Sequence, residues 1–215
     1  MIRVRLPTLA PAGGWNDGGN RLRDCLRRKR RPYRATANAF AWTEGSKDAA
    51  CVLSLQPGAY TAVVRGQNGG TGIVLLEAYE VDTANHASEL VNLSTRSMVK
   101  TADAVQIAGF IISGTAPQKV LIRASGPALT QYGVSNVLAD PVLEIHDATQ
   151  ATIATNDDWD SGLQASFQQL NINNWQLGSK DAAISLTLNP GAYTAVVSGK
   201  NGGMGNALVE VFITQ

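Results

Sequence analysis

Four oxygen-bearing side chains lie within five consecutive residues in the second half of the chain: Asn156, Asp157, Asp158 and Asp160. Calcium takes roughly six to eight oxygen ligands, and carboxylates in irregular loops commonly supply them. The pattern therefore predicts a calcium site. Further ligands are available if other loops converge on it, namely Asp181, Asp140 and Asp147. The alternative for the same residues is an Asx turn that caps the following segment.

A second candidate site lies just before this loop, where a histidine occurs in an alternating apolar stretch. Alternation places Leu143 and Ile145 on one face of a strand, and Glu144 and His146 on the other. A carboxylate beside an imidazole can orient it as a general base, and a calcium ion can polarise an ester or lactone carbonyl. One interpretation is therefore a calcium-dependent hydrolase with Glu144 and His146 as its acid/base pair. The other is an ordinary solvated strand face.

Tryptophans indicate a third kind of site. Trp159 and Trp175 lie near expected loops, and exposed aromatic rings stack on the apolar faces of ligands such as sugars. These residues predict a carbohydrate-binding module, and packing in the core or between repeats is the alternative. Serine and zinc chemistry have less support. The chain lacks a Gly-x-Ser-x-Gly elbow, and its two histidines and two cysteines match no zinc spacing.

The elements that must position these residues follow from an internal repeat. Residues 42–79 align without a gap with residues 175–212, at an offset of 133 (175 − 42), and about two thirds of the positions are identical. Solenoids repeat every 20–50 residues or so. A period of domain size therefore indicates tandem modules.

Each copy predicts a three-strand meander, in which a Pro-Gly turn joins the first two strands into a hairpin. The expected strands are residues 51–55, 60–64 and 73–81 in the first copy and 184–188, 193–197 and 207–213 in the second. Between the copies we expect strands at 105–113, 119–124, 142–146 and 152–155, and a short helix within 162–170. Many short strands with Gly and Pro punctuation predict an all-β fold, a β-sandwich or jelly-roll.

This organisation divides the chain into three parts. Residues 83–215 are expected to form a complete β-sandwich module. Residues 42–82 are expected to be the trailing meander of a truncated preceding repeat. Three strands alone bury too little to be stable. We therefore expect this meander to pack on the next module or to self-associate with another copy of the chain.

The third part, residues 1–41, differs in charge from the rest. Residues 1–34 carry ten Lys and Arg but only two Asp, whereas the whole chain has a net charge of +1. A nucleic-acid or membrane-surface arm is one interpretation of the basic run at 27–31. The favoured one is a segment that does not belong to the fold, because similarity to the repeat begins abruptly near Trp42. No nucleic-acid partner is therefore expected.

Membrane and targeting signals are also absent from the sequence. No run approaches the roughly 20 apolar residues of a membrane-spanning helix. Residues 1–14 contain no uninterrupted apolar stretch typical of a signal peptide.

The motif Leu-x-Pro-Gly-Ala-Tyr-Thr-Ala-Val-Val-x-Gly occurs at residues 55–66 and 188–199. With it the chain resembles the tandem β-sandwich repeats of large exported proteins from environmental bacteria. Further matching segments are residues 92–96, 109–114, 120–123, 126–127, 140–141 and 156–159. The resemblance implies a secreted or cell-surface setting, usually as a module of a longer chain, and supplies no established catalytic residues.

Together these observations predict an extracellular structural or ligand-binding module stabilised by calcium. A calcium-dependent hydrolase of ester or lactone substrates and a carbohydrate-binding module are the alternatives.

Overall fold

The computed structural model describes residues 2–6, 45–50, 53–80, 90–172 and 174–214. They divide between two compact units. The first contains the described residues of 2–6, 65–78 and 91–214, including every strand given below. The second contains the described residues of 45–64, 79–80 and 90, which form no strand.

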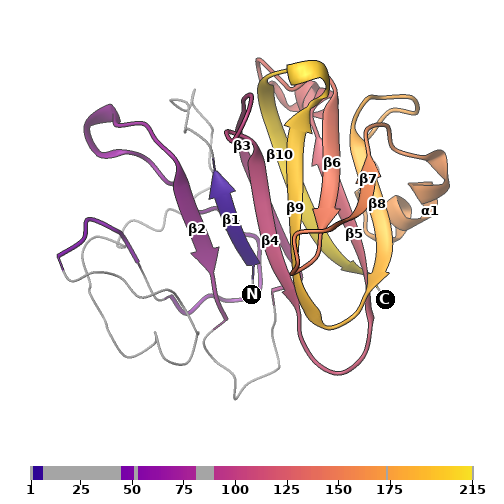
Figure 1. Cartoon of the computed structure of the whole chain (residues 1–215), viewed down its shortest axis with the longest axis horizontal. Helices are drawn as coiled ribbons and strands as arrows, with labels where there is room; N and C mark the ends of the chain where they lie inside the picture. The colour runs from indigo at the N-terminus through magenta and orange to yellow at the C-terminus, as the bar shows by residue number, and fades with distance from the viewer. Residues whose placement is uncertain (1, 7–44, 51–52, 81–89, 173, 215) are drawn as a thin grey trace. The chain divides into compact units, whose positions relative to one another are not determined.

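The first unit is all-β, as predicted, and consists of two antiparallel sheets (Figure 1). The strands of the six-stranded sheet are, in order across it, β2 (Val74–Ala78), β1 (Ile2–Leu6), β4 (Gln106–Ile112), β9 (Gly191–Gly199), β6 (Pro141–His146) and β7 (Thr152–Asn156). Those of the four-stranded sheet are β3 (Asn92–Val99), β10 (Gly205–Thr214), β5 (Gln118–Ser125) and β8 (Ala182–Leu188).

Short helices occur in the connections: η2 (Gln67–Gly69), η3 (Pro127–Tyr132), η4 (Ser161–Leu163), α1 (Gln164–Gln169) and η5 (Lys200–Gly202). The helix predicted within 162–170 is therefore confirmed.

The main core lies between the two sheets. Strand alternation sends every second side chain inward, as Leu143 and Ile145 of β6 illustrate, both with no exposed surface. From the smaller sheet, Val120 and Ile122 of β5 meet them in the same cluster. Burying such a side chain contributes about 1.5–3 kcal/mol. The predicted faces of the strand at 142–146 are thus confirmed.

The hairpin predicted in the second copy is wrong, although its strands are confirmed. β8 belongs to the smaller sheet and pairs with β5, whereas β9 belongs to the larger sheet and pairs with β4 and β6. The chain thus crosses the sandwich at Asn189 and Pro190, where the Tyr193 hydroxyl donates a hydrogen bond to the Asn189 carbonyl over 3.0 Å. β8 and β9 then both face one core from opposite sides.

The first copy departs further from the predicted meander. Residues 53–64 form no strand and are mostly exposed, so of the three predicted strands only the last appears within the described residues, as β2. Its local geometry nevertheless matches the second copy. The Tyr60 hydroxyl donates to the Gln56 carbonyl over 2.8 Å, and Asn68 and Asn201 share φ = 54°.

Residues 2–6 lie in the basic segment expected outside the fold, but they form β1, antiparallel to both β2 and β4. Apolar and arginine residues alternate there from Ile2 to Leu6, a period of two that is typical of a strand. The rest of that segment, residues 7–41, lies outside the described residues. How residues 42–82 as a whole pack stays a prediction.

Side-chain amides join the two sheets near both margins of the sandwich. Asn156 at the end of β7 accepts a hydrogen bond through Oδ1 from the Ala183 amide of β8 over 2.9 Å. On the other side, Gln106 of β4 donates through Nε2 to the Thr95 carbonyl of β3 over 2.8 Å. Both bonds satisfy backbone groups that face away from the ladder of an edge strand.

The pairing of the strands defines two ends of the sandwich. Asn92, where the chain enters β3, pairs with Phe212 near the end of β10. We call this the tether end. At the opposite end Val99 pairs with Gly205 and Pro141 with Gly199. The long connections 100–105, 126–140, 157–181 and 200–204 gather there, and we call it the loop end (Figure 1).

Two equivalent glycines of the repeat provide a matched test of this packing. A Cβ at Gly205 would lie 2.4 Å from the Leu138 amide nitrogen, whereas one at Gly72 would meet nothing within 4 Å. We expect Gly205→Ala to lower the free energy of unfolding by about 2–3 kcal/mol and Gly72→Ala by less than about 0.5 kcal/mol. Urea denaturation of both variants measures this, and equal losses would contradict the assigned environments.

Candidate functional site

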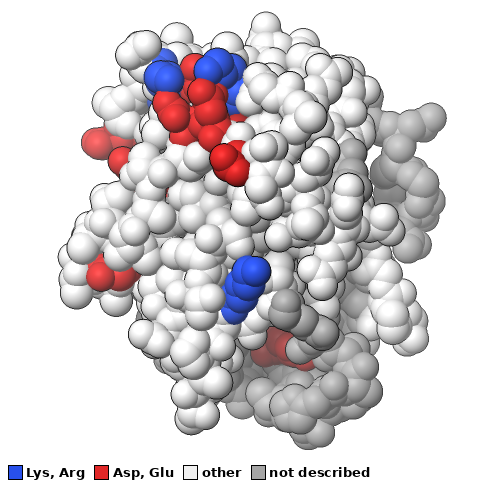
Figure 2. All heavy atoms as spheres, turned by 90° about the vertical axis from the view of Figure 1, so that its right-hand side faces the viewer, with Lys and Arg blue, Asp and Glu red and all other residues white. Residues whose placement is uncertain are grey.

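The acidic loop after β7 forms ion pairs with lysines of neighbouring connections. Asp157 Oδ2 lies 2.6 Å from Lys200 Nζ, and Asp158 Oδ2 lies 2.7 Å from Lys180 Nζ. Figure 2 shows acidic and basic side chains side by side at the loop end. The nearby Asp140 carboxylate acts on both lysines electrostatically. Its buried Oδ1 has no hydrogen-bond partner among the described residues.

These pairs shift the pKa values of their members. The hydrogen bond from Lys200, followed by its charge, lowers the pKa of Asp157 below the ordinary 3.8. The same bond raises the pKa of Lys200 above 10.5. A lowered carboxyl pKa stabilises the fold above pH 3.8, and this contribution is lost as the pH falls through the lowered value. The lysine contribution is lost as the pH rises through its raised value. Solvent-exposed pairs of this kind contribute little.

The other predicted calcium ligands are engaged in turns and caps. Asp160 accepts a hydrogen bond from the Gly162 amide over 2.6 Å and so caps η4. Asn156 donates through Nδ2 to the Asp158 carbonyl over 2.8 Å, in addition to its bond to β8. The bond at Asp160 corresponds to the Asx-turn alternative.

Asp181 is the most buried of the predicted ligands, with no exposed surface. Its Oδ1 accepts from the amides of Gly126 (2.7 Å) and Ala128 (3.1 Å), and its Oδ2 accepts from the Ser179 hydroxyl (2.7 Å). A buried carboxylate needs such donors to offset its lost hydration. Asp181 therefore holds the start of η3 against the segment that leads into β8.

The carboxylates thus do not converge as the calcium prediction requires. Over the residues that the structure describes, no three His, Cys, Asp or Glu side chains are placed to hold one metal ion. Lys180 and Lys200 provide positive charge at the place where a cation was expected. Calcium binding by this loop stays a prediction.

The structure does bring Glu144 and His146 together. Glu144 Oε2 lies 3.5 Å from His146 Nε2 on the outer face of β6. His146 Nδ1 lies 3.3 Å from the Thr152 hydroxyl and 3.4 Å from the Gln150 carbonyl. The imidazole is thus oriented, as a general base would need to be.

The two predicted calcium ligands nearest to this pair in sequence lie apart from each other. Asp140 and Asp147 flank opposite ends of β6, a strand of six residues that spans about 20 Å. Asp147 accepts from the Thr149 hydroxyl (2.7 Å), which lowers its pKa, and closes the turn to β7. His146 pairs with Thr152 near the tether end, whereas the loop that holds Asp157 begins at the other end of β7. The predicted metal ligands and the predicted base are therefore separated.

The two predicted sugar-binding rings are buried. Trp159 and Trp175 are 8% and 9% exposed and pack with Phe167 of α1 at centroid distances of 5.2–5.9 Å. We call these three residues the aromatic cluster. They cover Leu121 of β5 on the outer face of the smaller sheet. This burial removes the exposed faces that sugar stacking requires and corresponds to the core-packing alternative.

A shallow hollow of about 450 Å³ opens beside this cluster. Its lining residues are Trp159, Asp160, Ser161, Leu177 and Gly178. Of its two apolar lining side chains, Leu177 is 64% exposed and Trp159 is 8% exposed.

The residue that sequence reasoning missed is Arg123, which is 2% exposed. Its guanidinium donates to Glu210 Oε2 (2.6 Å) and, through NH1, to the Ile172 carbonyl (2.9 Å). It also lies over the rings of Trp175 (4.8 Å) and Phe167 (5.2 Å). A planar, delocalised cation suits this stacked and forked environment. The signal in the sequence is an arginine that directly follows the apolar run Val120–Ile122.

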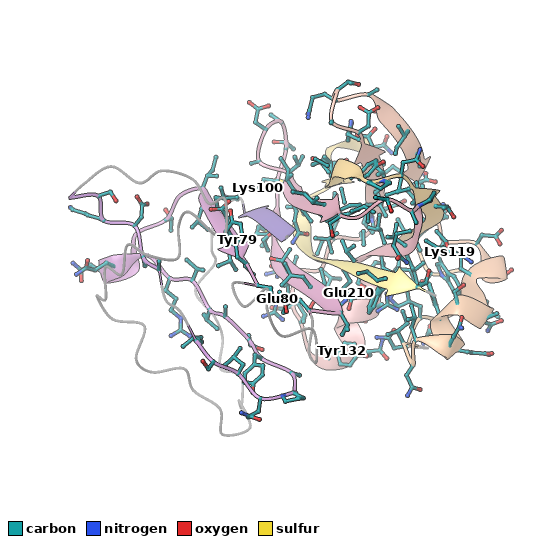
Figure 3. The ribbon with its side chains drawn as sticks, turned by 90° about the horizontal axis from the view of Figure 1, so that it is seen from below. Tyr79, Glu80, Lys100, Lys119, Tyr132 and Glu210 are labelled. Carbon is teal, nitrogen blue, oxygen red and sulfur yellow. The ribbon has the colours of Figure 1, made fainter. Side chains whose placement is uncertain are left out.

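Removing the Arg123 cation should destabilise the packing of the aromatic cluster against the smaller sheet. We expect Arg123→Met to lower the free energy of unfolding by about 3–5 kcal/mol, because Glu210 is left without its partner. Lys119 lies on the same strand but is exposed (Figure 3), so Lys119→Met should change stability by less than about 0.5 kcal/mol. Chemical denaturation followed by tryptophan fluorescence measures both. Similar effects of the two substitutions would contradict the central place of Arg123.

Asp181 can be tested as a structural carboxylate. We expect Asp181→Asn to cost about 1–3 kcal/mol, because the new amide group faces backbone donors. The loss should be the same with calcium and with EDTA, whereas a loss confined to calcium-containing buffer would indicate a metal ligand. Asp103→Asn, at an exposed position of the loop end that is not among the predicted ligands, serves as the control.

Comparisons with known proteins establish no family. No family model matches the chain, and no curated protein matches it. One solved structure that it is similar to is the pre-peptidase C-terminal domain of a collagenase from Bacillus anthracis, at 13% identity and a TM-score of 0.34. The match covers 58% of this chain and 90% of that one. Within its described residues, this chain has no helix long and apolar enough to cross a membrane.

Proposed function

We propose that residues 83–215 form a structural repeat module of an exported protein, tethered at one end and presenting its loops at the other. The pairing of Asn92 with Phe212 carries this proposal. Because the chain enters and leaves at the same end, the module can be linked to neighbours there. Its long connections at the opposite end then remain available for contacts.

The repeated residues support a structural role. Asp181, Tyr193 and Gly199 all have identical counterparts in the first copy. In the second copy they hold a turn, the crossing between the sheets, and a tight loop in which a Cβ on Gly199 would lie 2.0 Å from the Gly203 carbonyl oxygen. Duplication has thus preserved groups that build the fold. The candidates for chemistry from Glu144 to Asp160 lie outside the repeated segment.

The hydrolase is retained as a second candidate because of the contact between Glu144 and His146. It would act on small esters or lactones, with His146 as the base. If the module is structural, the chain and its His146→Ala variant should hydrolyse a panel of such substrates at the same background rate. A rate that falls in the variant and with EDTA would support the hydrolase instead.

Calcium stabilisation is part of the proposal and depends on the two lysines of the loop end. If a cation binds among Asp140, Asp157 and Asp158, Lys180 and Lys200 compete with it. We therefore expect calcium to raise the melting temperature more in the Lys180→Ala/Lys200→Ala variant than in the unaltered chain, through ligand linkage. Thermal melting with calcium and with EDTA measures this. If calcium changes the melting temperature of neither protein, the proposal of a bound calcium ion is excluded.

Self-association through β2 is a further part of the proposal. β2 is a terminal strand of the larger sheet, and its counterpart residues in β10 are paired on both sides. Light scattering on the full chain measures the mass, and a monomer at high concentration would exclude this association.

The exported setting has a direct test. Antibodies raised against this chain should label intact cells of the organism that makes it, or recover the protein from the medium. Labelling confined to permeabilised cells would contradict an exported module.

A further inference from the structure

β3 is held less firmly than the other strand at which the chain is tethered. It is an edge strand with one hydrogen-bonded neighbour, whereas β10 lies between β3 and β5. Of its core-facing side chains, Thr95 and Ser97 are polar, and only Val99 is a fully buried hydrocarbon. The Ser97 hydroxyl is buried and lacks a hydrogen-bond partner among the described residues. A buried hydroxyl without a partner destabilises the strand that carries it.

β10 is held on both sides and is also clamped at its end. Its inward residues Ala207, Val209 and Val211 all belong to the main core. At the tether end, Gln118 Nε2 of β5 donates to the Thr214 carbonyl over 2.7 Å. When the two strands are pulled apart, β3 is therefore the one that moves.

The register decides how tension reaches these strands. Asn92 pairs with Phe212, so a force between the two ends of the module acts first on the last pair of one ladder. Antiparallel strands pulled from the same end separate one pair at a time. Strands pulled from opposite ends must break the whole ladder together, which needs a larger force.

One side chain lies at the point where separation would begin. Asn92 Nδ2 donates to the Val211 carbonyl over 3.1 Å. This bond adds a cross-strand contact to the first pair of the β3–β10 ladder. Farther along β3, Gln106 holds the Thr95 carbonyl from the other sheet. Separation thus begins at the Asn92 bond and meets a second obstacle at Thr95.

We propose that β3 is a force-release strand, which peels from β10 under tension applied through the ends of the module, before the rest of the sandwich unfolds. The side-chain hydrogen bond of Asn92 sets the force at which peeling begins. This inference rests on the proposed role as a tethered module. Its test uses the isolated chain, so its outcome does not depend on where the protein is located.

Force spectroscopy with two attachment geometries tests the peeling. The full chain carries Cys25→Ser and Cys51→Ser, with handles at Val91→Cys and Gln215→Cys. We expect an early step that lengthens the tethered chain by about 50 Å. About 30 Å is the contour length of the eight residues of β3, and the rest is the distance of about 25 Å along the sandwich from the tether end to the loop end, where the chain then leaves the folded part. Handles at Lys100→Cys and Gln215→Cys load β10 along its length and should give one event at higher force. Rupture of both cysteine variants in a single step at equal force would overturn the proposal.

Substitutions on β3 should move the early step in opposite directions. Asn92→Asp removes the donor to Val211 and should lower the force of that step. Ser97→Ala removes the unpartnered hydroxyl and should raise it. Thr187→Ala, at an exposed position on the other edge strand of the same sheet, should leave it unchanged. If neither β3 substitution changes the force of the early step, the assignment of that step to β3 is overturned.

Hydrogen exchange without force provides an independent measurement. Amides of β3 that bond to β10 should exchange at least about tenfold faster than those of β10 that bond to β5, a difference of about 1.4 kcal/mol. Equal exchange of the two strands would mean that β3 has no separate opening.

Discussion

Both sheets depend on one shared apolar core, which β8 and β9 reach from opposite sides although they are consecutive in sequence. The crossing at Asn189 and Pro190 places Leu188 and Ala195 in the same cluster. Each strand then pairs with partners distant in the chain, β8 with β5 and β9 with β4 and β6. After β9 the chain crosses back to the smaller sheet at the loop end, through residues 200–204 to β10.

A second hydrophobic cluster, formed by the aromatic cluster and Leu121, lies on the outer face of the smaller sheet. Arg123 links the outer face of the smaller sheet to the segment after β7 through Glu210, the Ile172 carbonyl and the aromatic cluster. Asp181 ties the same segment to the start of η3. The polar groups that suggested chemistry are thus largely occupied in holding connections, since a buried charge is stable only when it is paired or hydrogen-bonded. A metal site requires free carboxylates, and a sugar site requires exposed aromatic rings.

Much of the fold was predictable where periodicity was strong. The strands of the second copy, the faces of β6 and the short helix all follow from alternation and turn residues. β3 was not assigned as a strand, because hydroxyl residues at Thr95 and Ser97 conceal its inward period. Of the candidate site, the contact of Glu144 with His146 and the Asx turn at Asp160 were predictable, because each joins residues two apart in the chain. Contacts such as Asp157 with Lys200 join residues far apart in sequence, which no local pattern predicts.

Local geometry was determined by the sequence itself, and sheet membership by tertiary structure. Tyr60 and Tyr193 make the same hydrogen bond, and Asn68 and Asn201 adopt the same backbone angle, because those contacts involve only near neighbours. Yet residues 60–64 form no strand, whereas their counterparts 193–197 lie within β9. A strand needs hydrogen-bonding partners and an apolar face to cover, and only the packing of the whole module supplies β4 and β6 to one copy and not to the other.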